Sequence, residues 1–122
     1  MRRTVFFNLR QIQLPVGALT SIAHRISGVL LACGIPLAMY VLQRSLRGPD
    51  SYAEVAAWFA SYPVKAVSLI LMWALAHHML AGIRHLLSDV DVGSRLPAAR
   101  RSAWTVNCLA IVIALLAAGV FL

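Results

Sequence analysis

The sequence predicts an all-α integral membrane protein with three transmembrane helices. Of its 122 residues, 61% are hydrophobic and only 12% are charged, whereas a soluble domain of this size needs far more polar surface. Three runs contain no Asp, Glu, Lys or Arg, namely 26–43, 66–83 and 102–122. Each is close to the roughly 20 residues that cross a bilayer as a helix. Continuous apolar runs favour helices over the alternating pattern of a membrane barrel.

The three runs extend into longer helices when their flanks are included. We expect the first helix over about 18–46, after a short lead, with Pro36 as a source of a kink. The second helix is expected over about 63–89, and the third over about 102–122 after an irregular loop that contains Gly93 and Pro97. All of 1–122 should form a single membrane-anchor domain. Because three helices make a thin bundle, we expect a partner membrane chain.

A short interfacial helix is predicted between the first two spans. Gly48-Pro49-Asp50 is typical of a turn, and Ser51 followed by Glu54 three residues later is typical of a capping box. The helix should run from 51 to 60. Three aromatic residues near it suit the interfacial belt of a bilayer: Tyr52, Trp58 and Tyr62.

The basic residues are divided unequally between the two ends of the spans. The net charge of +7 could suggest nucleic-acid binding, but the cations flank the spans, so we expect no nucleic-acid partner. One side carries eight: Arg2, Arg3, Arg10, Arg25, Arg84, Arg95, Arg100 and Arg101. The other side carries three: Arg44, Arg47 and Lys65. The positive-inside rule then predicts a cytoplasmic N-terminus and a C-terminus outside.

Polar groups are concentrated at the mouth of the first span. Ser21 and Arg25 are four residues apart, as are His24 and Gly28, so on a helix they share one broad face. An isolated Arg at this depth could simply extend to the lipid headgroups. Ser, His and Arg together favour a functional site, because polar groups beside hydrocarbon are costly.

A second polar cluster ends the second span. His77 and His78 are adjacent, so they point about 100° apart and at most one can face a given ligand. His78 shares a face with Gly82 and His85, and the missing side chain of Gly82 would let a flat ligand approach the backbone. Two interpretations remain open: an interhelical hydrogen bond, or ligation of haem iron by a neutral imidazole.

Depth separates the histidines further. Counted from Ile83 as the inner edge of the span, His78 should lie about 7–8 Å inside it, whereas His24 precedes the first span at Ile26. We therefore expect the two imidazoles at different heights and on different partners. His24 and Arg25 would suit anionic haem propionates, and a second axial histidine would come from another chain.

Several functional classes find no support in the sequence. No Asp or Glu lies inside a span, which argues against a proton-coupled transporter. No Gly-rich nucleotide loop, Cys cluster or zinc motif is present. Cys33 and Cys108 fall inside spans and fit small buried hydrophobic residues.

Two motifs, 21–28 (SIAHRISG) and 78–89 (HMLAGIRHLLSD), resemble the cytochrome b membrane-anchor subunit of succinate dehydrogenase, respiratory complex II. The resemblance implies that His78 is an axial ligand of haem b, with the other axial histidine supplied by a second small anchor subunit. It implies that Ser21 and Arg25 line the ubiquinone site beside the iron–sulfur subunit. His24 and Arg25 would lie near the haem propionates.

The resemblance also implies a function and a location. Succinate would be oxidised on a flavoprotein partner, and electrons would pass through the iron–sulfur subunit to ubiquinone at a bacterial inner membrane. In such a complex the protein binds and orients cofactors that carry the chemistry. Two alternatives remain: the anchor of a fumarate reductase, and a purely structural, haem-free anchor whose histidines only join helices.

Overall fold

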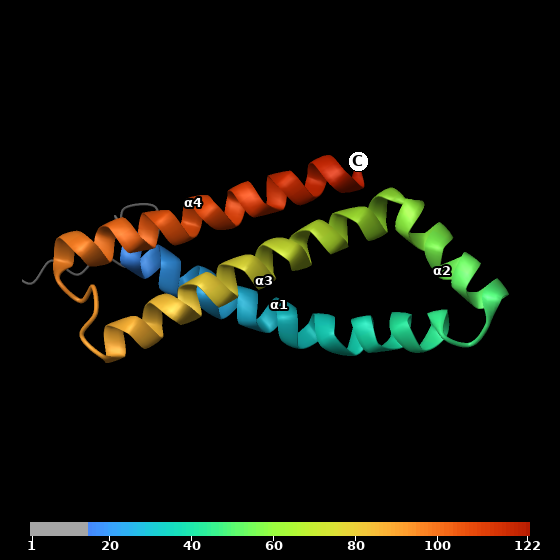
Figure 1. Cartoon of the computed structure of the whole chain (residues 1–122), viewed down its shortest axis with the longest axis horizontal. Coiled ribbons are helices and arrows are strands. Elements are labelled where there is room, and N and C mark those ends of the chain that lie inside the picture. The colour runs from blue at the N-terminus through green and yellow to red at the C-terminus, as the bar shows by residue number, and fades with distance from the viewer. Residues whose placement is uncertain (1–14) are drawn as a thin grey trace, which may run out of the picture.

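The computed structural model describes residues 15–122, which form four helices: α1 (Val16–Ser45), α2 (Pro49–Ala60), α3 (Tyr62–Asp89) and α4 (Leu96–Phe121). The three long helices run roughly along one axis in alternating directions, and α2 joins the end of α1 to the start of α3 (Figure 1). These three are long and apolar enough to cross a membrane. The predicted class of fold, three spans plus a short helix, is confirmed.

The first two spans begin and end close to their predicted bounds, but the third does not. Its helix begins at Leu96 rather than at about 102, so the predicted irregular loop over 90–101 is wrong in its second half. Arg95 is the N-cap and Pro97 lies in the first turn, where its fixed φ suits a helix start. Arg100 and Arg101 end the uncharged run, but the helix continues through them to Leu96. The lead was predicted over 1–16, and its residues 1–14, with three of the counted arginines, lie outside the described residues.

The long helices meet along seams of mostly small residues. The buried positions are Thr20, Ser27 and Gly34 on α1, Ala74, His77 and Ala81 on α3, and Ala103, Val106 and Ala110 on α4. On α1 they recur every seven residues, which keeps one face of the helix toward its neighbours. Small residues let membrane helices approach closely, because lipid tails provide no hydrophobic drive for association. His77 is the largest fully buried side chain in the described part of the chain.

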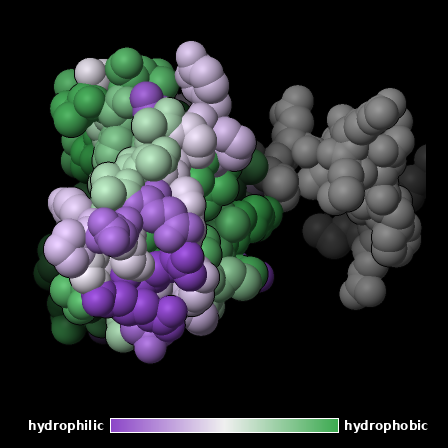
Figure 2. All heavy atoms as spheres, turned by 90° about the vertical axis from the view of Figure 1, so that its right-hand side faces the viewer, coloured by the Kyte–Doolittle hydropathy of each residue, from purple (hydrophilic) through white to green (hydrophobic). Residues whose placement is uncertain are grey.

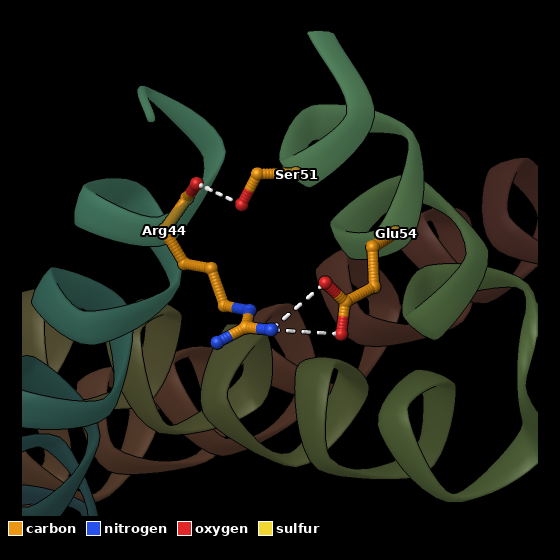
Figure 3. A network of polar contacts seen from close by, with 3 residues as sticks. All are labelled: Arg44, Ser51 and Glu54. Atoms are coloured by element: carbon orange, nitrogen blue, oxygen red, sulfur yellow. Dashed lines mark hydrogen bonds and ion pairs between the residues drawn. The ribbon is translucent and has the colours of Figure 1, made fainter. Parts of the chain in front are cut away.

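The junction of α1 and α2 differs from the predicted capping box. α2 begins at Pro49 with Gly48 as its N-cap, so the turn lies before Pro49. The Ser51 hydroxyl donates to the Arg44 carbonyl at 2.7 Å instead of capping its own helix. Glu54 accepts two hydrogen bonds from the Arg44 guanidinium, at 2.8 and 3.0 Å (Figure 3). The last carbonyls of a helix lack partners within that helix, so the Arg44 carbonyl can accept from Ser51, while the Arg44 side chain pairs with Glu54.

The α2 end of the molecule carries a patch of hydrophilic residues bordered by hydrophobic ones (Figure 2). The predicted aromatic residues lie at this end, with Tyr52 and Tyr62 exposed and Trp58 half-buried. The Arg44 guanidinium lies over the Trp58 ring, 5.3 Å from its centroid. These contacts attach α2 to the end of α1.

Candidate functional site

Three imidazoles, from α1 and α3, lie close together. These two helices cross toward the end of the bundle at which α4 starts (Figure 1). The His24 ring stacks on the His78 ring, with centroids 4.2 Å apart and an interplanar angle of 15°. The His85 ring lies 5.1 Å from that of His24, tilted by 51°. The two polar motifs of the sequence therefore form one site.

Glycines make this close approach possible. A Cβ added to Gly28 would lie 3.1 Å from Cε1 of His78, which is tighter than ordinary contacts. A Cβ at Gly82 would lie 3.8 Å from Nε2 of His24, a normal contact distance. A side chain at position 28 would therefore press on the His78 ring, whereas a Cβ at position 82 would only touch His24.

Two groups of α1 hold Nδ1 of His78. The nitrogen lies 3.2 Å from the His24 carbonyl oxygen and 3.2 Å from Oγ of Ser27. The Ser27 hydroxyl donates its proton to the same carbonyl at 2.7 Å, so its oxygen is free to accept. Both neighbours of Nδ1 are therefore acceptors, and we assign the ring proton to Nδ1. Nε2 keeps its lone pair, as a metal-binding imidazole requires.

His77 faces a different neighbour. Its side chain is 1% exposed, and its Nε2 lies 3.0 Å from Oδ1 of Asn107 on α4. The ring also packs at an angle against Trp73, one turn earlier on α3. Of the two adjacent histidines, only His78 joins the cluster with His24. His77 makes the interhelical hydrogen bond that was the alternative interpretation for this pair.

The expected difference in height between His24 and His78 is wrong. The two rings are stacked with their centroids 4.2 Å apart, so the predicted separation along the bundle is absent. α1 begins at Val16, so His24 stands more than two turns inside the helix rather than at its mouth. The charge-free run places the start of the span too late, because Arg25 interrupts it without interrupting the helix. Two rings stacked face to face cannot ligate opposite sides of one metal ion. The prediction that His24 and His78 do not share one iron is therefore unaffected.

Ser21 and Arg25 lie at the margin of this cluster. Ser21 is half-buried and Arg25 is exposed. Among residues 15–122, neither side chain makes a hydrogen bond. His24, Ser27 and Gly28 contact α3, whereas the Arg25 side chain is exposed.

Arg84, in the second motif, joins two helices. Its Nε donates to Oγ of Ser102 at 3.0 Å, and its Nη2 donates to the Ala99 carbonyl at 3.2 Å. These bonds attach the end of α3 to the start of α4. The guanidinium also lies beside α1, because a Cβ added to Gly17 would be 3.8 Å from its Nη2.

Sequence reasoning missed Asn107 and Thr20. The Thr20 hydroxyl lies 3.2 Å from Oδ1 of Asn107, the same oxygen that bonds His77. A lone Asn in an apolar run belongs to no motif. Its position inside a span is nevertheless a signal, because polar side chains there usually have a partner.

The chain matches a known family over nearly all of its length. The family model of the succinate dehydrogenase/fumarate reductase transmembrane subunit matches residues 1–117. The chain belongs to this family. It is 34% identical to the succinate dehydrogenase cytochrome b556 subunit of Coxiella burnetii over 122 residues, which cover 99% of this chain and 97% of that protein.

Two further relatives have similar names. The succinate dehydrogenase cytochrome b556 subunit of Paracoccus denitrificans is 35% identical over 115 residues, 93% of this chain and 88% of that protein. The mitochondrial cytochrome b560 subunit of Mus musculus is 29% identical over 101 residues, 81% of this chain and 57% of that protein. The predicted cytochrome b membrane-anchor subunit of succinate dehydrogenase is confirmed, and neither the fumarate reductase anchor nor a purely structural anchor is favoured.

Proposed function

We propose that this chain holds a haem b through Nε2 of His78, in a haem site shared with a second small membrane subunit. The main support for this proposal is that the His24 carbonyl and the Ser27 hydroxyl hold Nδ1 of His78. A hydrogen bond from the far ring nitrogen fixes the tautomer and orientation of metal-ligating histidines. When bound, haem b supplies a one-electron carrier. The relatives' names, which include cytochrome b, support the proposal.

The residues around His78 fit a haem. Nε2 of His24 is buried, and it has no hydrogen-bond partner among the described residues. A buried polar nitrogen normally has a partner, and a propionate carboxylate would supply one, with Arg25 next in sequence as a counter-charge. Gly82 on α3 lies beside this nitrogen, with no side chain between them.

The second axial histidine would come from the other membrane subunit. Within residues 15–122, His24 is stacked on the proposed ligand and His77 is bonded to Asn107. Neither ring is placed to ligate the opposite side of the same iron. An iron–sulfur subunit and a flavoprotein subunit would complete the complex.

Substitution of the two adjacent histidines tests the haem proposal. In the purified complex, His78→Ala should abolish or shift the reduced-minus-oxidised spectrum of b-type haem. His77→Ala should retain a b-type spectrum, because that ring faces α4. Loss of haem in His77→Ala with retention in His78→Ala would overturn the assignment.

We further propose that Ser21 and Arg25 contribute to a ubiquinone site at the interface with the iron–sulfur subunit. The exposed Arg25 and half-buried Ser21 lie one turn apart on α1, beside the imidazole cluster. Reduction of a quinone places negative charge on its oxygens before protons arrive. Arg25 would stabilise that charge, and the Ser21 hydroxyl would donate a hydrogen bond to the same oxygen.

Conservative variants separate this role from anchoring. A headgroup anchor needs only charge, so Arg25→Lys would be nearly silent, whereas a quinone site needs the planar guanidinium. We expect Arg25→Lys and Ser21→Ala to lower quinone reduction on the order of 10²-fold, as loss of one oxyanion donor does. Succinate oxidation with an artificial acceptor upstream of the quinone should persist. Wild-type quinone reduction in both variants would refute the site.

We also propose a bacterial inner membrane with a cytoplasmic N-terminus. Among the described residues, the histidine-cluster end carries more basic residues than the α2 end: Arg25, Arg84, Arg95, Arg100 and Arg101 against Arg44, Arg47 and Lys65. The positive-inside rule supports a cytoplasmic location for the first group. Ser21 and Arg25 would then face the soluble subunits.

A further inference from the structure

We propose that Asn107 of α4 is a positioning residue for the haem ligand, acting through His77 on α3 and Thr20 on α1. This inference rests on the proposed role of His78. No residue of α4 belongs to the cluster of His24, His78 and His85. Under this proposal α4 nevertheless controls how the His78 ring is oriented toward the iron.

The first step is the burial of His77 in a seam of small side chains. His77 is 1% exposed, and the other buried residues of α3 are alanines. An imidazole in such a seam fixes how α3 can rotate against α4, because the facing surfaces leave little room for it. Its bond to Asn107 satisfies Nε2, so the buried ring is held by chemistry as well as by shape.

The second step is that one oxygen serves two helices. Oδ1 of Asn107 lies 3.0 Å from Nε2 of His77 and 3.2 Å from Oγ1 of Thr20. Thr20 is fully buried, and its hydroxyl is also within 2.9 Å of the Val16 carbonyl. The single hydroxyl proton of Thr20 is shared between the Val16 carbonyl and Oδ1 of Asn107. The amide oxygen has a second lone pair for the hydrogen bond to Nε2 of His77. It thereby fixes α1 and α3 relative to each other.

The third step is that this network closes on the proposed ligand. Thr20 precedes His24 by four residues on α1, and His77 precedes His78 directly on α3. The carbonyl of His24 and the hydroxyl of Ser27 in turn hold Nδ1 of His78. α1 and α3 are thus joined twice, once through Asn107 and once at the ligand, and a rotation of α3 strains both connections.

The consequence is geometric control of the ligand. A side chain about 5–6 Å from its helix axis moves by about 1 Å when the helix rotates by 10°. Ligand sets tolerate only about 0.5 Å and 10–20° before their function changes. Interhelical hydrogen bonds resist such rotations in membranes.

The test compares variants of the intact purified complex. Asn107→Leu removes the shared acceptor and keeps a side chain branched at Cγ, and Thr20→Val removes only one of its two bonds. Thr105→Val is the matched control, because Thr105 is exposed and, among residues 15–122, its hydroxyl bonds only the Arg101 carbonyl of the same helix. The readouts are the haem midpoint potential and the low-spin ferric EPR spectrum, which a role confined to stability would leave unchanged.

We expect Asn107→Leu to retain haem, to shift the EPR g values, and to change the reduced-to-oxidised ratio at the wild-type midpoint by about threefold. Threefold corresponds to the roughly 0.6 kcal/mol average of an interhelical hydrogen bond. Thr20→Val should shift both readouts less, and Asn107→Gln, which keeps the amide, should lie closer to wild type than Asn107→Leu.

Three outcomes decide against the inference or its basis. Wild-type potential and EPR spectrum in haem-loaded Asn107→Leu would overturn it. If that variant does not assemble, unchanged readouts in Thr20→Val would do the same. A wild-type complex without haem would instead overturn the proposed function on which the inference rests.

Discussion

Gly28→Ala is expected to weaken the haem site without unfolding the bundle. The new Cβ would lie 3.1 Å from Cε1 and 3.5 Å from Nδ1 of His78, whereas carbon atoms prefer about 3.5–4.0 Å. The ring must therefore retreat from α1 by about half an ångström. Nδ1 is already 3.2 Å from both the His24 carbonyl and Ser27. The retreat would bring these separations to roughly 3.7 Å, beyond a useful hydrogen bond.

Two opposing terms set the effect on overall stability. Overpacking costs about 1–3 kcal/mol, and replacing Gly by Ala in a helix interior contributes about 1 kcal/mol in the opposite direction. The bundle should therefore be destabilised by about 0–2 kcal/mol. The free energy lost at the site should be larger, because disturbing an outer-shell partner of a metal ligand lowers metal affinity by about 10- to 100-fold.

Haem titration of the purified complex measures this difference, with the reduced-minus-oxidised spectrum as the signal. Gly119→Ala is the matched control, since no atom lies within 4 Å of its added Cβ. Thermal unfolding of both variants in the same detergent distinguishes a loss of haem affinity from a loss of overall stability. Wild-type haem affinity in Gly28→Ala would refute the argument that the His24 carbonyl and Ser27 fix the ligand.

Three further predictions concern packing, the α1–α2 junction and topology. Gly34→Ala should lower the thermal stability of the complex, because its Cβ would lie 2.8 Å from Cδ2 of Leu71; adding Leu71→Ala should recover part of the loss, and an additive result would contradict this contact. The coupling between Arg44 and Glu54, measured by a double-mutant cycle with Arg44→Gln and Glu54→Gln, should fall with added salt, because the pair is partly exposed; salt-independent coupling would contradict an electrostatic origin. A reporter fused after α4 should be periplasmic and one inserted in the α3–α4 loop cytoplasmic; a cytoplasmic reporter after α4 would overturn the proposed orientation.

The spans were predictable because a segment that lies in the hydrocarbon core of a bilayer must consist almost entirely of uncharged, apolar residues. A run without charges marks the hydrocarbon portion of a helix, and all three runs lie within observed helices except for the last residue of the third, Leu122. Helix ends depend on other forces. Arg100 and Arg101 end the apolar run before α4, yet the helix continues back to Leu96, because a helix at the bilayer surface tolerates charge on its exposed side. The capping box failed for a related reason, since Ser51 found a carbonyl of the preceding helix.

The site was predictable where residues carry a repeating chemical pattern. Spacing along α3 placed His78 with Gly82 and His85, and the structure brings His78 and His85 to His24. The relative height of His24 and His78 was not predictable from run boundaries, because α1 and α3 pack along a seam whose register is set by small residues. Asn107 escaped notice because its partners, His77 and Thr20, lie 30 and 87 residues away in the chain.

The seam of small residues has a consequence for how temperature acts on this protein. Most large apolar side chains lie outside the seam, for example Met39 at 60% and Leu115 at 66% exposed. In a bilayer these side chains contact acyl chains whether the helices are together or apart, so separating the helices hydrates little apolar surface. Hydration of apolar surface is what gives water-soluble domains their unfolding heat capacity of about 12–15 cal/mol/K per residue. The association of α1, α3 and α4 should therefore have a heat capacity change near zero, and its free energy should vary almost linearly with temperature.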